Sequence, residues 1–199
     1  MKFIFVFPLV AAAGLLAGCS TQRLVASYTI DPKPPRIDYS DLKPVADRQP
    51  VALVFDMQND KGQFPEGTAQ LGSKLARVIE HSRLFAGIAK VPSATTAKLQ
   101  ITLRDMAGFS GDERKKLPPG LTSNLTNSEA AVLYLFSASF QASGQSPVSK
   151  VYHHAIHVLN SKSGWIDNQP PMTASQATGV MLEQLTLNFL YDLQREGKL

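Results

Sequence analysis

The chain has 199 residues, which is enough for one domain with a hydrophobic core and too few for two large domains. Hydrophobic residues make up 44% and charged residues 18%, so the composition excludes a disordered polymer and a protein with many membrane spans. The net charge of +4 and the pI near 9.2 slightly favour anionic neighbours such as phosphorylated lipids. The positive charge is too small and too scattered to indicate nucleic-acid binding.

The first segment of the chain has the pattern of a secretory signal. Lys2 supplies a positive charge, and residues 3–17 are apolar apart from Pro8 and Gly14. A helix that spans a bilayer needs about 20 apolar residues. The run therefore fits a removable signal better than a retained membrane anchor, which is the alternative.

The apolar run ends in Leu16-Ala17-Gly18-Cys19, and Cys19 is the only cysteine. A branched apolar residue, two small residues and a cysteine resemble the lipobox of bacterial lipoproteins. The resemblance implies that residues 1–18 are removed and that lipidation of Cys19 holds the mature protein in a membrane. Ser20 stands where an aspartate would otherwise signal retention, and in that family this implies the outer membrane, with the domain facing the periplasm.

Five prolines and scattered charges follow the cysteine, within residues 20–50. Such a composition favours extended backbone of about 3.1 Å per residue. We therefore expect a lipidated N-terminus and tether over residues 19–50 and a globular domain over residues 51–199. Residues 24–30, "LVASYTI", are the exception, because they predict a short strand that either docks on the domain or binds a partner.

The spacing of apolar residues in the domain predicts four strands and two helices. The strands are expected at 51–57, 97–105, 131–141 and 146–160. The first helix is expected over 68–85, with Thr68 as N-cap and Gly87 as its C-terminal stop. The second helix begins at a capping box formed by Thr173 and Gln176.

The resulting order, β-α-β-β-β-α, predicts an α+β fold. We expect a two-layer sandwich with two long helices packed on one face of a mostly antiparallel four-stranded sheet. This order behind a lipobox is similar to that of small envelope lipoproteins, such as the lipoprotein partner of the outer-membrane lipopolysaccharide-assembly barrel and auxiliary lipoproteins of lipid-transport ABC systems. The segment "STQRLVAS" lacks the apolar, glycine-containing motif that those assembly partners carry after the cysteine. No site residues are carried over from either family.

Residues 107–129 form a long segment of turn residues and charges between two predicted strands. Loops of this length are uncommon unless they are functional or disordered. The alternative is a solvated hairpin excursion. We expect a partner to contact this segment at its basic cluster, Arg114, Lys115 and Lys116, and at the adjacent Leu117.

The sequence offers no strong metal or catalytic motif. In "YHHAIH", His153 and His157 fall on one face of a predicted strand, about 13 Å apart, and His154 falls on the other, so one zinc ion cannot take all three. Asp56 and Asp60 are better explained by turn chemistry than by a cation site. We expect no cofactor, no metal and no catalytic residues, although a hydrolase that gathers Asp56, a histidine and a distant serine stays open.

Two functions fit these observations. The first is a lipid-anchored, non-catalytic accessory or scaffold protein that binds an envelope assembly or transport complex through a sheet edge or the 107–129 segment. The second is a carrier or sensor that binds an apolar or lipid ligand between the helices and the sheet. The two differ in the space between the layers, because complete packing there would leave no room for a ligand.

Overall fold

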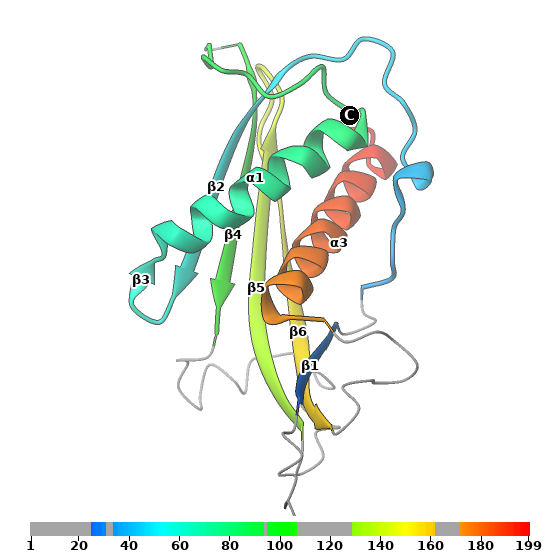
Figure 1. Cartoon of the computed structure of the whole chain (residues 1–199). Helices are drawn as coiled ribbons and strands as arrows, with labels where there is room; N and C mark the ends of the chain where they lie inside the picture. The colour runs from blue at the N-terminus through cyan, green and yellow to red at the C-terminus, as the bar shows by residue number, and fades with distance from the viewer. Residues whose placement is uncertain (1–24, 31–33, 94, 107–128, 162–171) are drawn as a thin grey trace, which may run out of the picture.

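A computed structural model describes residues 25–30, 34–93, 95–106, 129–161 and 172–199. The two α-helices of these residues lie on the same face of one sheet (Figure 1). The elements are, in chain order, β1 (Val25–Ile30), the 3₁₀ turn η1 (Tyr39–Asp41), β2 (Val51–Asn59), β3 (Gly62–Gln63), α1 (Pro65–Ser82), β4 (Ala97–Asp105), β5 (Glu129–Gln141), β6 (Val148–Ser161) and α3 (Ala174–Arg195).

The sheet has six strands in the order β1-β6-β5-β4-β2-β3. Only β2 and β4 pair in parallel, because α1 provides the crossover between them, and the other four pairs are antiparallel. The predicted α+β class and the mostly antiparallel sheet are confirmed. The prediction of four strands is wrong, because the chain turns back after β2 to add the two-residue β3, and because β1 pairs with the second edge of β6.

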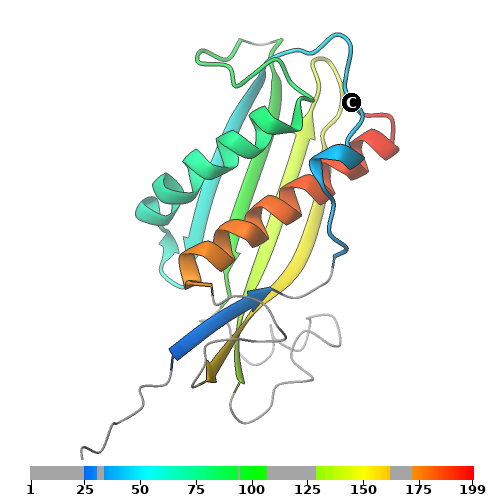
Figure 2. The same ribbon diagram turned by 45° about the vertical axis from the view of Figure 1, so that its right-hand side comes forward.

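The core fills the space between the helices and the sheet. Leu99, Ile101 and Leu103 point from β4 toward the helices and are fully buried, as their alternation with polar residues predicts. Phe136 of β5 lies beside Leu103 in the register. The helices contribute further side chains that are 0% exposed: Leu75, Ile79, Met181, Leu182, Leu185, Phe189, Leu190 and Leu193. The centre of the sandwich, between the helices and the sheet that Figure 2 shows, is therefore packed with buried side chains.

Helix α1 starts and ends earlier than the sequence predicts. It begins at Pro65, with Phe64 in the N-cap position, and Thr68 lies inside the first turns. The Thr68 hydroxyl donates to the Phe64 carbonyl and accepts from the Met57 amide, so it ties the helix to β2 instead of capping it. The helix stops at Arg83, which adopts a left-handed conformation (φ 57°), before the chain reaches Gly87.

The second half of the chain follows the prediction closely. The capping box of Thr173 and Gln176 is present at the start of α3. Strands β5 and β6 form a hairpin whose turn contains Gly144 at φ 71°.

The strand predicted for residues 24–30 is also present, because Val25–Ile30 docks antiparallel on β6.

Residues 34–50, here called the strap, lie against α3 and not away from the domain (Figure 2). Leu42 is only 5% exposed, and the side-chain amides of Gln184 and Asn188 donate to the carbonyls of Pro34 and Pro35. The tether predicted for residues 19–50 is corrected to this extent: strand β1 and the strap belong to the folded domain, which begins before Val51. The prolines set extended backbone, but the apolar residues between them bind the helix.

Candidate functional site

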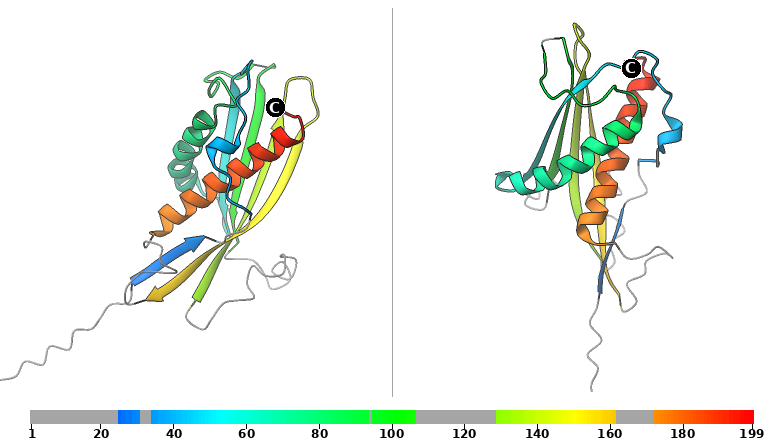
Figure 3. Two further views of the ribbon diagram at one scale, coloured as in Figure 1. Left: turned by 90° about the vertical axis from the view of Figure 1, so that its right-hand side faces the viewer. Right: turned by 45° about the horizontal axis from the view of Figure 1, so that its top comes forward.

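The outer face of the sheet, opposite the helices, carries most of the exposed residues of the strands. Two rows of side chains cross it from β2 to β6, as the strand register shows. One row consists of Val54, Gln100, Ser139 and Ser149, and the other of Asp56, Thr102, Ser137 and Val151. No helix of the described residues covers these rows (Figure 3).

Two exposed valines mark this outer face. Val54 is 54% exposed and Val151 is 57% exposed, although both lie in the interior of strands. The rows between them are small and polar, and Ser149 donates to Ser139 across the strands at 2.9 Å. A surface with polar groups and isolated exposed apolar side chains is suited to a protein partner.

Away from the β5–β6 turn, the outer face of the sheet becomes apolar and buried. There Met106, Leu133 and Ala155 are at most 7% exposed and form a second, smaller apolar cluster with Leu135. The Met106 amide donates to the Leu133 carbonyl, which continues the pairing of the strands past Asp105. The exposed part of the outer face is therefore the half nearer the β5–β6 turn.

The histidines of "YHHAIH" follow the predicted alternation. His153 and His157 are half-buried on the outer face, whereas His154 is completely buried on the helix side, with its Nδ1 3.0 Å from the Ala155 carbonyl oxygen. The strand fold predicted for this segment is confirmed. Within the described parts of the chain, no three His, Cys, Asp or Glu side chains come together in a way that could hold a metal ion.

Asp56 does not meet these histidines. Its carboxylate accepts a hydrogen bond from Gln58 at 2.7 Å on β2. His153 lies on β6, which is three strand positions away across the sheet, or about 14 Å. The cluster considered for a hydrolase is therefore not assembled from Asp56 and the strand histidines.

A hollow of about 540 Å³ opens at the end of the sandwich near the β5–β6 turn. Leu84, Phe85 and Phe140 form its apolar base, and the two phenyl rings are 5.9 Å apart. Hydroxyl groups of Ser93 and Thr96 lie at its rim, where they hydrogen-bond to each other at 2.8 Å. This combination of an apolar base and a polar rim is typical of a pocket for an amphiphile. Three separate connections build it, and no local sequence pattern identifies it.

A polar cluster fixes the end of α3 to β6. The Tyr152 hydroxyl donates to Asp192 at 2.8 Å, and the Lys150 ammonium lies 3.0 Å from the same carboxylate and 2.6 Å from Glu196. Burial, the hydrogen bond to Asp192 and the charge of that carboxylate raise the pKa of Tyr152. These contacts indicate a structural role, because every side chain of the cluster pairs with another side chain of the cluster.

The same cluster shifts the pKa values of its charged members in opposite directions. Burial alone would raise the pKa of Asp192, but hydrogen bonds from Lys150 and Tyr152 and the charges of Lys150 and Arg195 outweigh it, so this pKa is lowered. Burial alone would lower the pKa of Lys150, but its hydrogen bonds to Glu196 and Asp192 raise it. Both shifts favour the charged pair at neutral pH.

The other residues predicted to be functional lie outside the described residues. These are the predicted lipidation site Cys19 and the predicted partner contacts Arg114, Lys115, Lys116 and Leu117. Of the helices that the structure describes, none is long and apolar enough to cross a membrane. The alternation of polar and apolar residues predicted the outer face, but nothing in the sequence distinguished Val54 and Val151 from core valines.

Comparisons with known proteins leave the family open. No family model matches the chain, and no curated protein matches it. Among solved structures, an uncharacterized protein is 13% identical with a TM-score of 0.33, covering 78% of this chain and 94% of its own. The rare lipoprotein B from Shewanella oneidensis is 12% identical with a TM-score of 0.31, covering 72% of this chain and 95% of its own. Likenesses this low carry no argument about fold or function.

Proposed function

We propose that this chain is a lipid-anchored, non-catalytic accessory protein of the bacterial envelope, held in the outer membrane by Cys19 and bound to a partner protein of an assembly or transport complex. The residues Leu16-Ala17-Gly18-Cys19 support the anchor. The partner-binding role is supported by the outer face of the sheet, which is exposed at Val54 and Val151.

The exposed outer face is the observation that carries this proposal. A sheet of this type normally buries one face and solvates the other with polar residues. Two valines more than half exposed in neighbouring rows depart from that pattern, and burying a valine side chain contributes about 1.5 kcal/mol or more. The filled centre of the sandwich supports a scaffold over a carrier, because side chains occupy the space between the layers.

The anchor is tested on the protein purified from its own membranes. Intact-mass measurement should show a chain that starts at residue 19 and carries acyl groups on that cysteine. Cys19→Ala should leave the protein unlipidated and move it out of the membrane fraction, whereas the matched variant Ser20→Ala should leave both unchanged. An intact leader or an unmodified thiol at Cys19 would refute the anchor.

The partner surface is tested by placing a photo-reactive amino acid at single valines in living cells. Val54 and Val151 report on the outer face, and Val180, which is 40% exposed on α3, is the matched control on the helix layer. We expect one protein to be cross-linked from both outer-face positions and not from Val180. The same product from all three positions would contradict a specific outer face. No product from Val54 and Val151 would reject it.

A second candidate function has one observation in its favour. The hollow of about 540 Å³ over Phe85 and Phe140 falls in the size range of small-molecule pockets, so a carrier or sensor for an apolar or lipid ligand is an alternative. An environment-sensitive fatty-acid probe should bind with one-to-one stoichiometry, and Ala142→Trp should block it by filling the rim. Binding that Ala142→Trp leaves unchanged would exclude this pocket as the site.

A further inference from the structure

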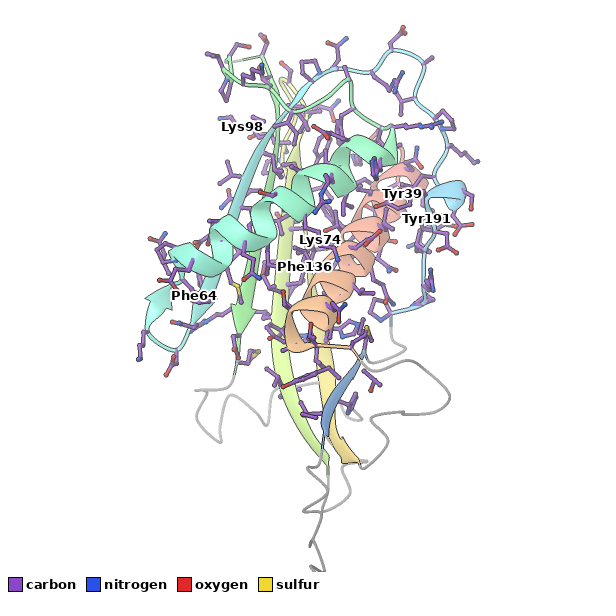
Figure 4. The ribbon with its side chains drawn as sticks, viewed as in Figure 1. Tyr39, Phe64, Lys74, Lys98, Phe136 and Tyr191 are labelled. Atoms are coloured by element: carbon purple, nitrogen blue, oxygen red, sulfur yellow. The ribbon has the colours of Figure 1, made fainter. Side chains whose placement is uncertain are left out.

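A second hollow lies between the two helices, on the side away from the sheet. It has a volume of about 270 Å³, and its walls are Lys74, Arg77, Val78 and His81 of α1, Glu183 of α3 and Tyr39 of the strap. Lys74 and Tyr39 are labelled in Figure 4, where Lys74 lies between α1 and α3. Lys74 and Arg77 lie outside the apolar stripe of α1, and Lys74 is partly buried whereas Arg77 is exposed.

The wall of this hollow holds two cations, Lys74 and Arg77, against one carboxylate, Glu183. Among the described residues, neither Lys74 nor Arg77 makes a hydrogen bond or an ion pair. They are three residues apart on one helix, a spacing at which like charges destabilise it slightly. The one carboxylate in the wall, Glu183, already accepts a hydrogen bond from the Tyr39 hydroxyl at 2.9 Å.

Gly179 of α3 makes room for Lys74 in this position. A Cβ atom on Gly179 would lie 2.6 Å from the Lys74 Nζ and 3.0 Å from its Cδ. The hydrocarbon stem of Lys74 therefore crosses from α1 onto the backbone of α3. Packing of a lysine stem against apolar surface holds its ammonium group in a defined place.

A neighbouring hollow of about 410 Å³ shares Tyr39 and His81 with the first one and has Arg83 in its wall. The Tyr39 and His81 rings meet edge to face, with their centres 6.1 Å apart, and separate the two spaces. Arg83 occupies a left-handed conformation that glycine normally takes at a helix end. Arg83 therefore adds a cation to the wall of the neighbouring hollow and not to that of the first.

We propose that this inter-helix hollow binds a phosphate group. Arg77 offers the planar fork of donors that grips phosphate oxygens in pairs, and Lys74 adds a compact charge with three donors. The His81 ring provides a further nitrogen in the wall. A hollow of 270 Å³ accommodates a phosphate and a few attached atoms, whereas it is too small for a strand or helix of an acidic protein.

The inference is tested by isothermal titration calorimetry on the full protein purified from membranes in non-ionic detergent. The probes are inorganic phosphate and glycerol 3-phosphate, with sodium sulfate at equal ionic strength as the comparison. Lys74→Gln and Arg77→Gln should each weaken phosphate binding about tenfold, the usual effect of losing one charge-assisted hydrogen bond. Gly179→Ala should weaken it several-fold by displacing the ammonium while every cation is retained.

Lys98→Gln is the matched control, because it removes one positive charge from the exposed outer face of the sheet (Figure 4). This variant should change the affinity less than twofold. Phosphatidic acid in mixed micelles tests whether the phosphate belongs to a lipid headgroup or to a soluble ligand. If phosphatidic acid competes with inorganic phosphate, and the competition is lost in Arg77→Gln, the ligand is a lipid headgroup. If phosphatidic acid does not compete, the ligand is a soluble phosphorylated molecule. No phosphate binding, or an equal loss in Lys98→Gln and Lys74→Gln, would overturn the inference. Neither result depends on the lipid anchor.

Discussion

Three glycines in the two helices provide a strict test of the packing between the layers. Each is changed to alanine, which favours a helix interior by about 0.8–1.0 kcal/mol over glycine. A Cβ on Gly72 would meet only the Phe55 ring at 3.8 Å, an ordinary contact. A Cβ on Gly67 would lie 2.5 Å from both the Met57 sulfur and the Phe64 ring, which is too close.

These contacts predict opposite signs for the same substitution. Gly72→Ala should stabilise the protein by close to the full helix-propensity gain. Gly179→Ala should stabilise it nearly as much, because the atom in its way is the movable end of Lys74. Gly67→Ala should destabilise it, because overpacking costs about 1–3 kcal/mol and the propensity gain is smaller in the first turn of a helix.

Urea and thermal unfolding followed by far-UV circular dichroism measure the three effects. We expect Tm to rise by about 2–4 °C for Gly72→Ala, to rise slightly less for Gly179→Ala and to fall for Gly67→Ala. Lys74→Ala combined with Gly179→Ala should recover the full gain, since the displaced side chain is then absent. A rise in all three single variants would show that α1 does not approach β2 as closely as Met57 and Phe64 require.

Two further predictions concern the attachment of α3 to its neighbours. Asp192→Asn should destabilise the protein by about 1–2 kcal/mol at pH 7, because Lys150 loses one ion-pair partner and Tyr152 keeps only a weaker acceptor. Because the pKa of Asp192 is lowered in the folded protein, its stabilisation is present above about pH 4 and is lost as the pH falls through the folded value. The difference between variant and parent in urea should therefore shrink toward pH 2, and a constant difference would contradict the charge effect. Leu42→Ala should cost about 2 kcal/mol and expose the strap to protease, whereas Lys43→Ala at an exposed position should change neither, and equal effects would show that the strap does not pack through Leu42.

The long elements were predictable because each buries one continuous face. Strand β4 alternates apolar and polar residues over its whole length, and its predicted bounds, 97–105, agree with the structure. The capping box at Thr173 fixes the start of α3 by local hydrogen bonds alone. Strand β3 was not predictable, because two residues carry no periodicity and owe their pairing to the turn after Asn59.

The strap and the inter-helix hollow were missed for a common physical reason. The apolar residues of the strap, such as Leu42, follow no helix or strand spacing, and its polar contacts join its backbone to side chains about 150 positions away in the chain. Lys74 and Arg77 lie outside the apolar stripe of α1, and the sequence pattern of the helix by itself predicts that such residues are exposed to solvent. Only the docking of the strap and the absence of a side chain at Gly179 convert that face into a walled hollow.

The docking of β1 and the strap on the domain also reduces the distance at which the proposed anchor could hold the proposed partner surface above a membrane. The expected tether of residues 19–50 would have reached about 100 Å when extended. With β1 paired to β6, only five residues lie between Cys19 and Val25, and an extended chain of this length spans about 20 Å.

The length of β6 adds to the distance between the membrane and the outer-face valines. Val25 pairs with Ser161, and Val151 lies ten residues back along β6, or about 33 Å toward the β5–β6 turn. If the domain stands upright on the membrane, the proposed partner would therefore contact Val54 and Val151 well above the lipid headgroups. If the sheet instead lay flat with its outer face on the membrane, photo-reactive groups at both valines would cross-link to lipid, and that product would exclude the upright arrangement.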